Sequence, residues 1–171
     1  MRDRETLQEI GADKVVMREG LQKAEGSATM STGAYGAIPR DDFQRQSAHA
    51  NLFYEEVRNR TGDIPKISHN TGFSEEDVAK IRGHVFVNKY DLGGEKPERF
   101  DSDYYMAVSW QRLVDGKNIQ EMDIVLLHHE LLEYRLMNEQ GMKYATAHAI
   151  AEKEHNYVKY IKELIEKGGL L

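Results

Sequence analysis

Asp123-Ile-Val-Leu-Leu-His-His-Glu-Leu-Leu-Glu-Tyr-Arg-Leu-Met137 is the stretch from which the fold of this chain is best predicted. Its apolar residues occur at almost every angle of a helical wheel, so the stretch predicts one largely buried helix. Asp123 is expected to cap the start, because a carboxylate can accept hydrogen bonds from the free N–H groups of a first helical turn. Gly141 is expected to end the helix, because glycine adopts the left-handed conformation without steric cost.

Three polar side chains interrupt the apolar surface of this predicted helix. His129 and Glu133 lie one turn apart on one side, and Glu130 lies beside them. Burying ionised carboxylates without partners costs several kcal/mol or forces a shift in their pKa. The sequence therefore requires a compensating feature at this point: a metal ion, a basic partner or a water-filled cleft.

Composition excludes several classes of function. The chain has 171 residues and a formal net charge of −6, which argues against a large basic surface for nucleic acid. It contains no cysteine, so disulfides and thiolate metal ligands are excluded. No apolar run is long enough to span a bilayer, and the N-terminal residues lack an apolar signal region. We therefore expect no membrane partner and a site of action in a cytoplasm.

Periodicity along the rest of the chain predicts an all-α fold. We expect a compact bundle of about five helices with at most a minor β-hairpin near residues 84–92. The helices are expected at about 42–60, 74–87, 101–115, 123–137 and 144–167. Residues 25–42 are small and turn-rich, which is typical of a linker. The predicted organisation is an extended N-terminal arm over residues 1–42 and a helical His/Glu-containing domain over residues 43–171.

The spacing of His129, Glu130 and Glu133 predicts a metal site. Histidine and glutamate at i and i+4 can bind one ion from one helix face, and His148 on the next helix can supply a third ligand. Glu130 can act as general base on a bound water, as the glutamate does in His-Glu-x-x-His metalloproteases. The fourth position here is Glu133, so that protease motif is not matched. A metal-free catalytic or binding cluster and a purely structural His–Glu pair are the alternatives.

The other histidines are less informative. His84 follows an apolar helical pattern and is a further candidate for the site. Glu152 and His155 share a helix side with His148, but a solvated charged face is the expected environment of these two. His128 is expected at the surface.

Four stretches of the chain resemble a C-terminal domain of phage head-morphogenesis (minor capsid) proteins and related polymorphic-toxin proteins of Gram-positive bacteria. They are Phe53-Tyr-Glu-Glu-Val-Arg-Asn-Arg60, Asn70-Thr-Gly-Phe-Ser-Glu-Glu-Asp-Val-Ala-Lys-Ile-Arg-Gly-His-Val-Phe86, Phe100-Asp-Ser-Asp-Tyr-Tyr-Met-Ala-Val-Ser-Trp-Gln-Arg-Leu113, and Asp123-Ile-Val-Leu-Leu-His-His-Glu-Leu-Leu-Glu133 with Ala147-His148. The resemblance covers about residues 50–160. The family pattern matches at His84, His129, Glu130, Glu133 and His148. It departs at Tyr90, where the resemblance implies a second histidine.

The resemblance implies a toxin-like effector that is virion-associated or secreted, with a capsid, carrier or immunity protein as partner. Together with the His/Glu cluster, it leads us to expect a metal-dependent hydrolase, a nuclease or a peptidase. His129, Glu133 and His148 would hold a divalent ion, with zinc or manganese favoured, and Glu130 and His84 would be catalytic. Nucleic acid is a possible substrate. The alternative is a non-enzymatic capsid-associated or partner-binding domain, in which the cluster only fixes helix register.

Overall fold

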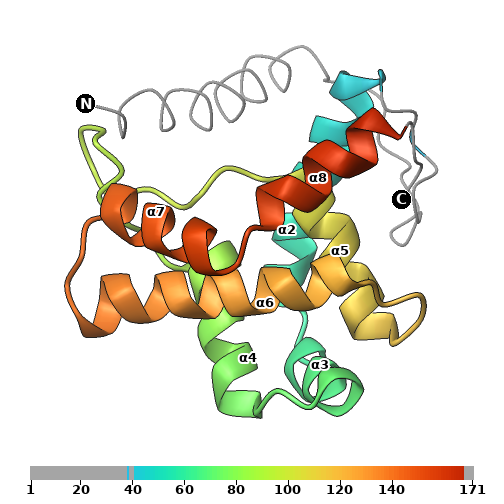
Figure 1. The fold of residues 1–171 in the computed structure, drawn as a ribbon, viewed down its shortest axis with the longest axis horizontal. Helices are drawn as coiled ribbons and strands as arrows, with labels where there is room; N and C mark the ends of the chain where they lie inside the picture. Colours follow the sequence, from blue (N-terminus) through green and yellow to red (C-terminus); the bar gives the residue numbers. More distant parts are fainter. Residues whose placement is uncertain (1–37, 39–40, 168–171) are drawn as a thin grey trace.

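The computed structural model describes residue 38 and residues 41–167, and this part of the chain is a compact all-α bundle (Figure 1), as predicted. Two π-helical turns, η1 (Gly83–Val87) and η2 (Arg135–Glu139), directly continue α4 and α6. The α-helices of the described part are α2 (Phe43–Asn59), α3 (Asp63–Thr71), α4 (Glu75–Arg82), α5 (Tyr104–Asp115), α6 (Glu121–Tyr134), α7 (Tyr144–Glu154) and α8 (Tyr157–Glu166).

Helix α6 lies at the centre of the bundle. It packs against α4, α5, α7 and α8, and it runs across the middle of Figure 1. Because neighbours surround it, its leucines at 126, 127 and 131 are buried together with His129, Glu130 and Glu133. The prediction of a largely buried helix at 123–137 is therefore confirmed, polar residues included.

The two ends of this helix differ in how well the sequence predicted them. Gly141 has a φ of +69° and follows η2, so the expected glycine stop is confirmed. Asp123 does cap the helix, but as the third residue of a capping box with Gln120, because α6 begins two residues earlier, at Glu121. In this box the Asp123 carboxylate accepts from the backbone N–H of Gln120 (2.9 Å), and it also pairs with Arg112. The same carboxylate therefore caps α6 and joins it to the buried Arg112 of α5.

The predicted helix over 144–167 is broken in two. Helix α7 ends at Glu154, and α8 begins at Tyr157 after a turn at His155 and Asn156. The side chain of Asn156 accepts a hydrogen bond from the backbone N–H of Lys159 (2.7 Å), which makes it the N-cap of α8. Helix α8 therefore runs in a different direction from α7. The backbone carbonyl of His155, at the break, is left free to accept a hydrogen bond from His129.

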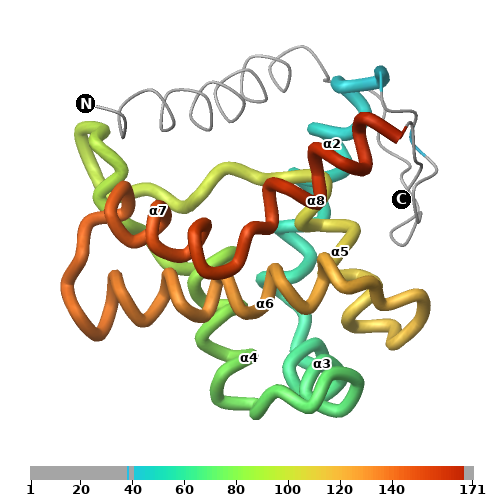
Figure 2. Tube along the Cα trace, in the orientation of Figure 1, coloured from blue at the N-terminus to red at the C-terminus, as the bar shows by residue number. Residues whose placement is uncertain are grey.

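The connection between η1 and α5 is the longest non-helical segment in the described part. The predicted hairpin is reduced to one isolated antiparallel bridge between Tyr90 and Glu98. After this bridge the chain runs alongside α7, as Figure 2 shows, and the ring of Phe100 lies 5.0 Å from that of Tyr144 at the start of α7. The connection therefore covers the outer side of the region where η1, α6 and α7 meet.

The hydrophobic core joins α2, α3, α4, α5 and α6, and its largest member is Trp110, whose indole N–H donates to Asp63 (3.0 Å). Most of the predicted arm at residues 1–42 lies outside the described residues. Ile38 belongs to the described part and is buried against Ala50, Tyr104 and Val108. None of the helices within residues 41–167 combines the length and apolarity needed to cross a membrane.

Candidate metal centre

All five residues predicted from the sequence converge on one buried cluster. His84 comes from η1, His129, Glu130 and Glu133 come from α6, and His148 comes from α7. Four of the five are buried, and His148 is the most exposed, with 13% of its side chain accessible. The structure thus brings together residues that lie up to 64 positions apart (148 − 84) in the sequence.

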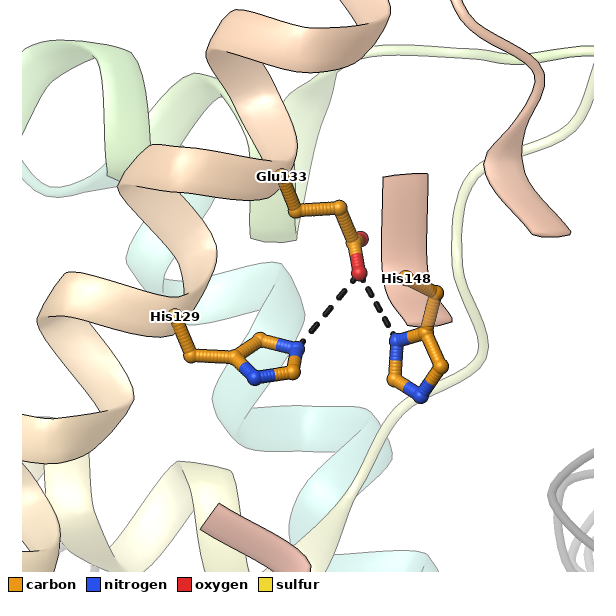
Figure 3. A group of neighbouring side chains, drawn as sticks. All are labelled: His129, Glu133 and His148. Carbon is orange, nitrogen blue, oxygen red and sulfur yellow. Dashed lines mark hydrogen bonds and ion pairs between the residues drawn. The ribbon is translucent and has the colours of Figure 1, made fainter. Parts of the chain in front are cut away.

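Glu133 is the hub of this cluster, because imidazoles approach both of its carboxylate oxygens. Oε2 lies 2.8 Å from Nδ1 of His148 and 3.5 Å from Nε2 of His129, the two contacts drawn in Figure 3. Oε1 lies 2.9 Å from Nε2 of His84. The same nitrogen of His84 is 3.8 Å from Oε2 of Glu130, which places the second carboxylate at the edge of the group.

The orientation of His129 is fixed by the break between α7 and α8. Its Nδ1 lies 2.9 Å from the backbone carbonyl of His155. A carbonyl oxygen only accepts, so Nδ1 carries a hydrogen and Nε2 is the nitrogen directed at Glu133. Metal-binding histidines are commonly held in this way, with one ring N–H donated to a carbonyl and the other nitrogen facing the ion.

The pKa values of His129 and Glu133 are shifted in opposite directions by their surroundings. Burial by itself lowers the pKa of His129, but the hydrogen bond to Glu133 and the charges of Glu130 and Glu133 outweigh it and raise that pKa to about 9. Burial alone would raise the pKa of Glu133, yet the hydrogen bonds from His129, His148 and His84 hold it well below its usual range. In the metal-free chain His129 and Glu133 therefore form a buried ion pair, and a metal ion would have to displace the proton of His129.

The donor atoms lie close enough together for one metal ion to contact several of them. Two groups are present in the described part, His129 with Glu133 and His148, and His84 with Glu130 and Glu133, each with its ligand atoms within 4.8 Å of one another. Around a tetrahedral zinc ion, with ligands at about 2.0–2.2 Å, neighbouring donors are about 3.3–3.5 Å apart. The 3.5 Å separation of His129 and Glu133 matches this spacing, whereas His148, at 2.8 Å, would move outward by some tenths of an ångström.

Tyr90 lies directly against the cluster. Its hydroxyl is 2.7 Å from Nδ1 of His84 and also meets the side-chain amides of Asn88 (3.2 Å) and Asn138 (3.1 Å). The ring of Phe100 stands 5.1 Å from that of His84 and 5.3 Å from that of Tyr90. The connection 88–103 therefore contributes side chains to the cluster that no periodic pattern indicated.

Two further groups were not identified from the sequence. Glu152 was expected on a solvated face, but it is half-buried and its Oε2 lies 3.5 Å from Nδ1 of His129. The carbonyl of His155 is the second, and the signal that could have revealed it is Asn156, a preferred N-cap residue in the middle of the apparent helix. The prediction that His128 is exposed is confirmed.

No family model, curated protein or solved structure matches this chain.

Proposed function

We propose that this protein is a toxin-like, metal-dependent hydrolase whose divalent ion is held by His129, Glu133 and His148. The observation that carries the metal site is the orientation of His129, whose Nδ1 donates to the His155 carbonyl and whose Nε2 faces the Glu133 carboxylate 3.5 Å away. With its proton removed, this nitrogen would direct a lone pair at a carboxylate, which is unfavourable unless a cation lies between them. The toxin-like role, and an immunity or carrier protein as partner, follow from the sequence resemblance alone.

The donor set suits a hydrolytic metal. Two imidazoles and one carboxylate bind zinc in many hydrolases and leave one position for water, and manganese accepts the same ligands. A bound divalent ion lowers the pKa of such a water and polarises the bond to be cleaved. Glu130 adjoins the ligand His129 in sequence and shares the cluster with Glu133, which supports a role as the base that takes the proton from that water. His84 contacts both carboxylates and orients them.

Purified protein is expected to hold close to one zinc or manganese ion per chain, and His129→Ala is expected to lose it. The reason is that the substitution removes the nitrogen whose orientation defines the site. Elemental mass spectrometry of protein purified without chelators gives the stoichiometry. His128→Ala is the matched control, because His128 is the adjacent histidine on the same helix and is exposed. Equal metal content in His129→Ala and the parent would rule out this ligand set.

Glu130→Gln is expected to keep the metal and to lower the hydrolytic rate by about 10²–10⁴-fold, because the amide cannot accept the proton of the water. The rate is measured on RNA, DNA and unfolded protein as substrates, and growth is followed after expression in bacterial cells. Glu139→Gln is the control, since Glu139 is an exposed carboxylate paired with Lys80. Toxicity equal to that of the parent would contradict the hydrolase and favour the non-enzymatic partner-binding domain.

One contact favours a second candidate, a metal-free acid–base site. At 2.8 Å, Nδ1 of His148 donates a good hydrogen bond to Glu133, and Nε2 of the same ring has no hydrogen-bond partner among the described residues. A carboxylate that orients an imidazole in this way leaves the other nitrogen available as a general base. The two candidates differ in their response to chelation: only the metal-free site keeps its activity in the presence of EDTA.

A further inference from the structure

The hydroxyl of Tyr90 occupies the centre of a small hydrogen-bond network beside the metal ligands. It lies within hydrogen-bond distance of three groups: Nδ1 of His84, the amide of Asn88 and the amide of Asn138. The amide of Asn138 is oriented by a second contact, because its nitrogen also lies 2.9 Å from the carbonyl oxygen of Tyr134, which only accepts. Asn138 therefore donates one hydrogen to Tyr134 and the other to Tyr90.

The donors and acceptors in this network can be assigned by counting hydrogens. A tyrosine hydroxyl has one hydrogen and two lone pairs. Both amides donate to Tyr90, so both lone pairs are used, and the hydroxyl hydrogen is directed to Nδ1 of His84. That nitrogen must then be the unprotonated one. The hydrogen of His84 is on Nε2, where it is donated to Oε1 of Glu133 at 2.9 Å.

We infer that Tyr90 is a positioning residue that sets the tautomer of His84 and thereby directs Glu133. With Oε1 occupied by the Nε2–H of His84, Glu133 presents only Oε2 to His129 and His148. His84 is consequently a partner of the ligand Glu133 and not itself a ligand. The expected effect of Tyr90 on metal affinity rests on the proposed metal site. The assignment of the His84 tautomer does not depend on that site.

Long-range ¹H–¹⁵N correlation spectra of the histidine side chains of the metal-free protein test the inference. In the parent, His84 is expected to show an unprotonated Nδ1 and a protonated Nε2. Tyr90→Phe removes the hydroxyl hydrogen that faces Nδ1, so the preference for this tautomer is expected to weaken. Tyr134→Phe is the matched control, because its ring meets that of His84 edge-on at 6.0 Å. If the parent carries the hydrogen on Nδ1, or if Tyr90→Phe leaves the spectrum of His84 unchanged, the inference is overturned.

A metal titration gives the second readout. Loss of a partner that orients a metal ligand typically weakens binding by about 10–100-fold, and this increase is expected in the zinc dissociation constant of Tyr90→Phe but not of Tyr134→Phe. Unchanged affinity in Tyr90→Phe would refute the link to Glu133. Failure of the parent itself to bind zinc would contradict the proposed function and leave the tautomer assignment to be judged by the spectra.

Discussion

Glu133→Gln is expected to abolish metal binding and to lower the free energy of unfolding of the metal-free protein by about 3–5 kcal/mol. The size of the effect follows from the position of Glu133 at the hub of three imidazoles. Its carboxylate offers only acceptors to the ring N–H groups of His84, His148 and protonated His129. A glutamine has nearly the same shape but presents two hydrogens of its own, so at least one buried donor faces another donor.

The two parts of this prediction are measured separately. Denaturant unfolding in a chelating buffer gives the change in stability of the metal-free protein. Thermal unfolding with and without zinc shows the metal contribution. A ligand that binds only the folded state raises the free energy of unfolding by RT ln(1 + [L]/Kd). The midpoint of the parent is expected to rise with zinc, and that of Glu133→Gln is expected to stay constant.

Glu139→Gln controls for the change of charge. Glu139 lies in η2, five residues after the end of α6, and its exposed carboxylate is 3.5 Å from Lys80. Removal of such a surface pair changes stability by about 0–1 kcal/mol, so this variant should resemble the parent in both experiments. If Glu133→Gln still binds zinc with the affinity of the parent, the ion must be held elsewhere.

The centre of the fold could be predicted from the sequence because local pattern and tertiary role agree there. An apolar surface interrupted by His129, Glu130 and Glu133 has few physical solutions, and a buried polar cluster is one of them. Helical periodicity also placed His148 on a neighbouring helix. All of these side chains lie on helices, where the position in the sequence determines the direction of the side chain. Their spacing in the sequence therefore predicts which of them share one side of a helix.

The remaining parts of the site are determined by non-local contacts. Tyr90 lies in an irregular connection whose path no periodicity describes, and its hydroxyl finds its partners in three different segments. The His155 carbonyl is available only because the chain leaves the helical direction at Asn156, which local apolar spacing concealed. The capping role of Asp123 could be predicted from local sequence, but its pairing with the buried Arg112 of another helix could not.

Arg112→Met is expected to destabilise the protein by about 3–5 kcal/mol, or about 10 °C in the midpoint of thermal unfolding, without loss of metal. The guanidinium of Arg112 holds both oxygens of Asp123, with Nε to Oδ2 at 2.8 Å and Nη2 to Oδ1 at 2.6 Å. Both side chains are almost fully inaccessible to solvent. Methionine fills similar space, but the buried Asp123 carboxylate loses both hydrogen bonds from the guanidinium and keeps the one from the Gln120 N–H.

The comparison that identifies the cause is a double replacement. The double variant Arg112→Met/Asp123→Leu also removes the unpaired carboxylate of Asp123. It is expected to recover much of the stability that Arg112→Met loses, because apolar residues often replace a buried ion pair at little cost. Arg135→Met is the exposed counterpart: Arg135 pairs with Asp77 at 3.1 Å on the surface, and its loss should cost about 0–1 kcal/mol. A double variant no more stable than Arg112→Met would show that the pair stabilises the fold by its own attraction. Because this pair joins α5 to α6 and shares no residue with the histidine cluster, Arg112→Met should lower stability without changing metal content, whereas Glu133→Gln should change both.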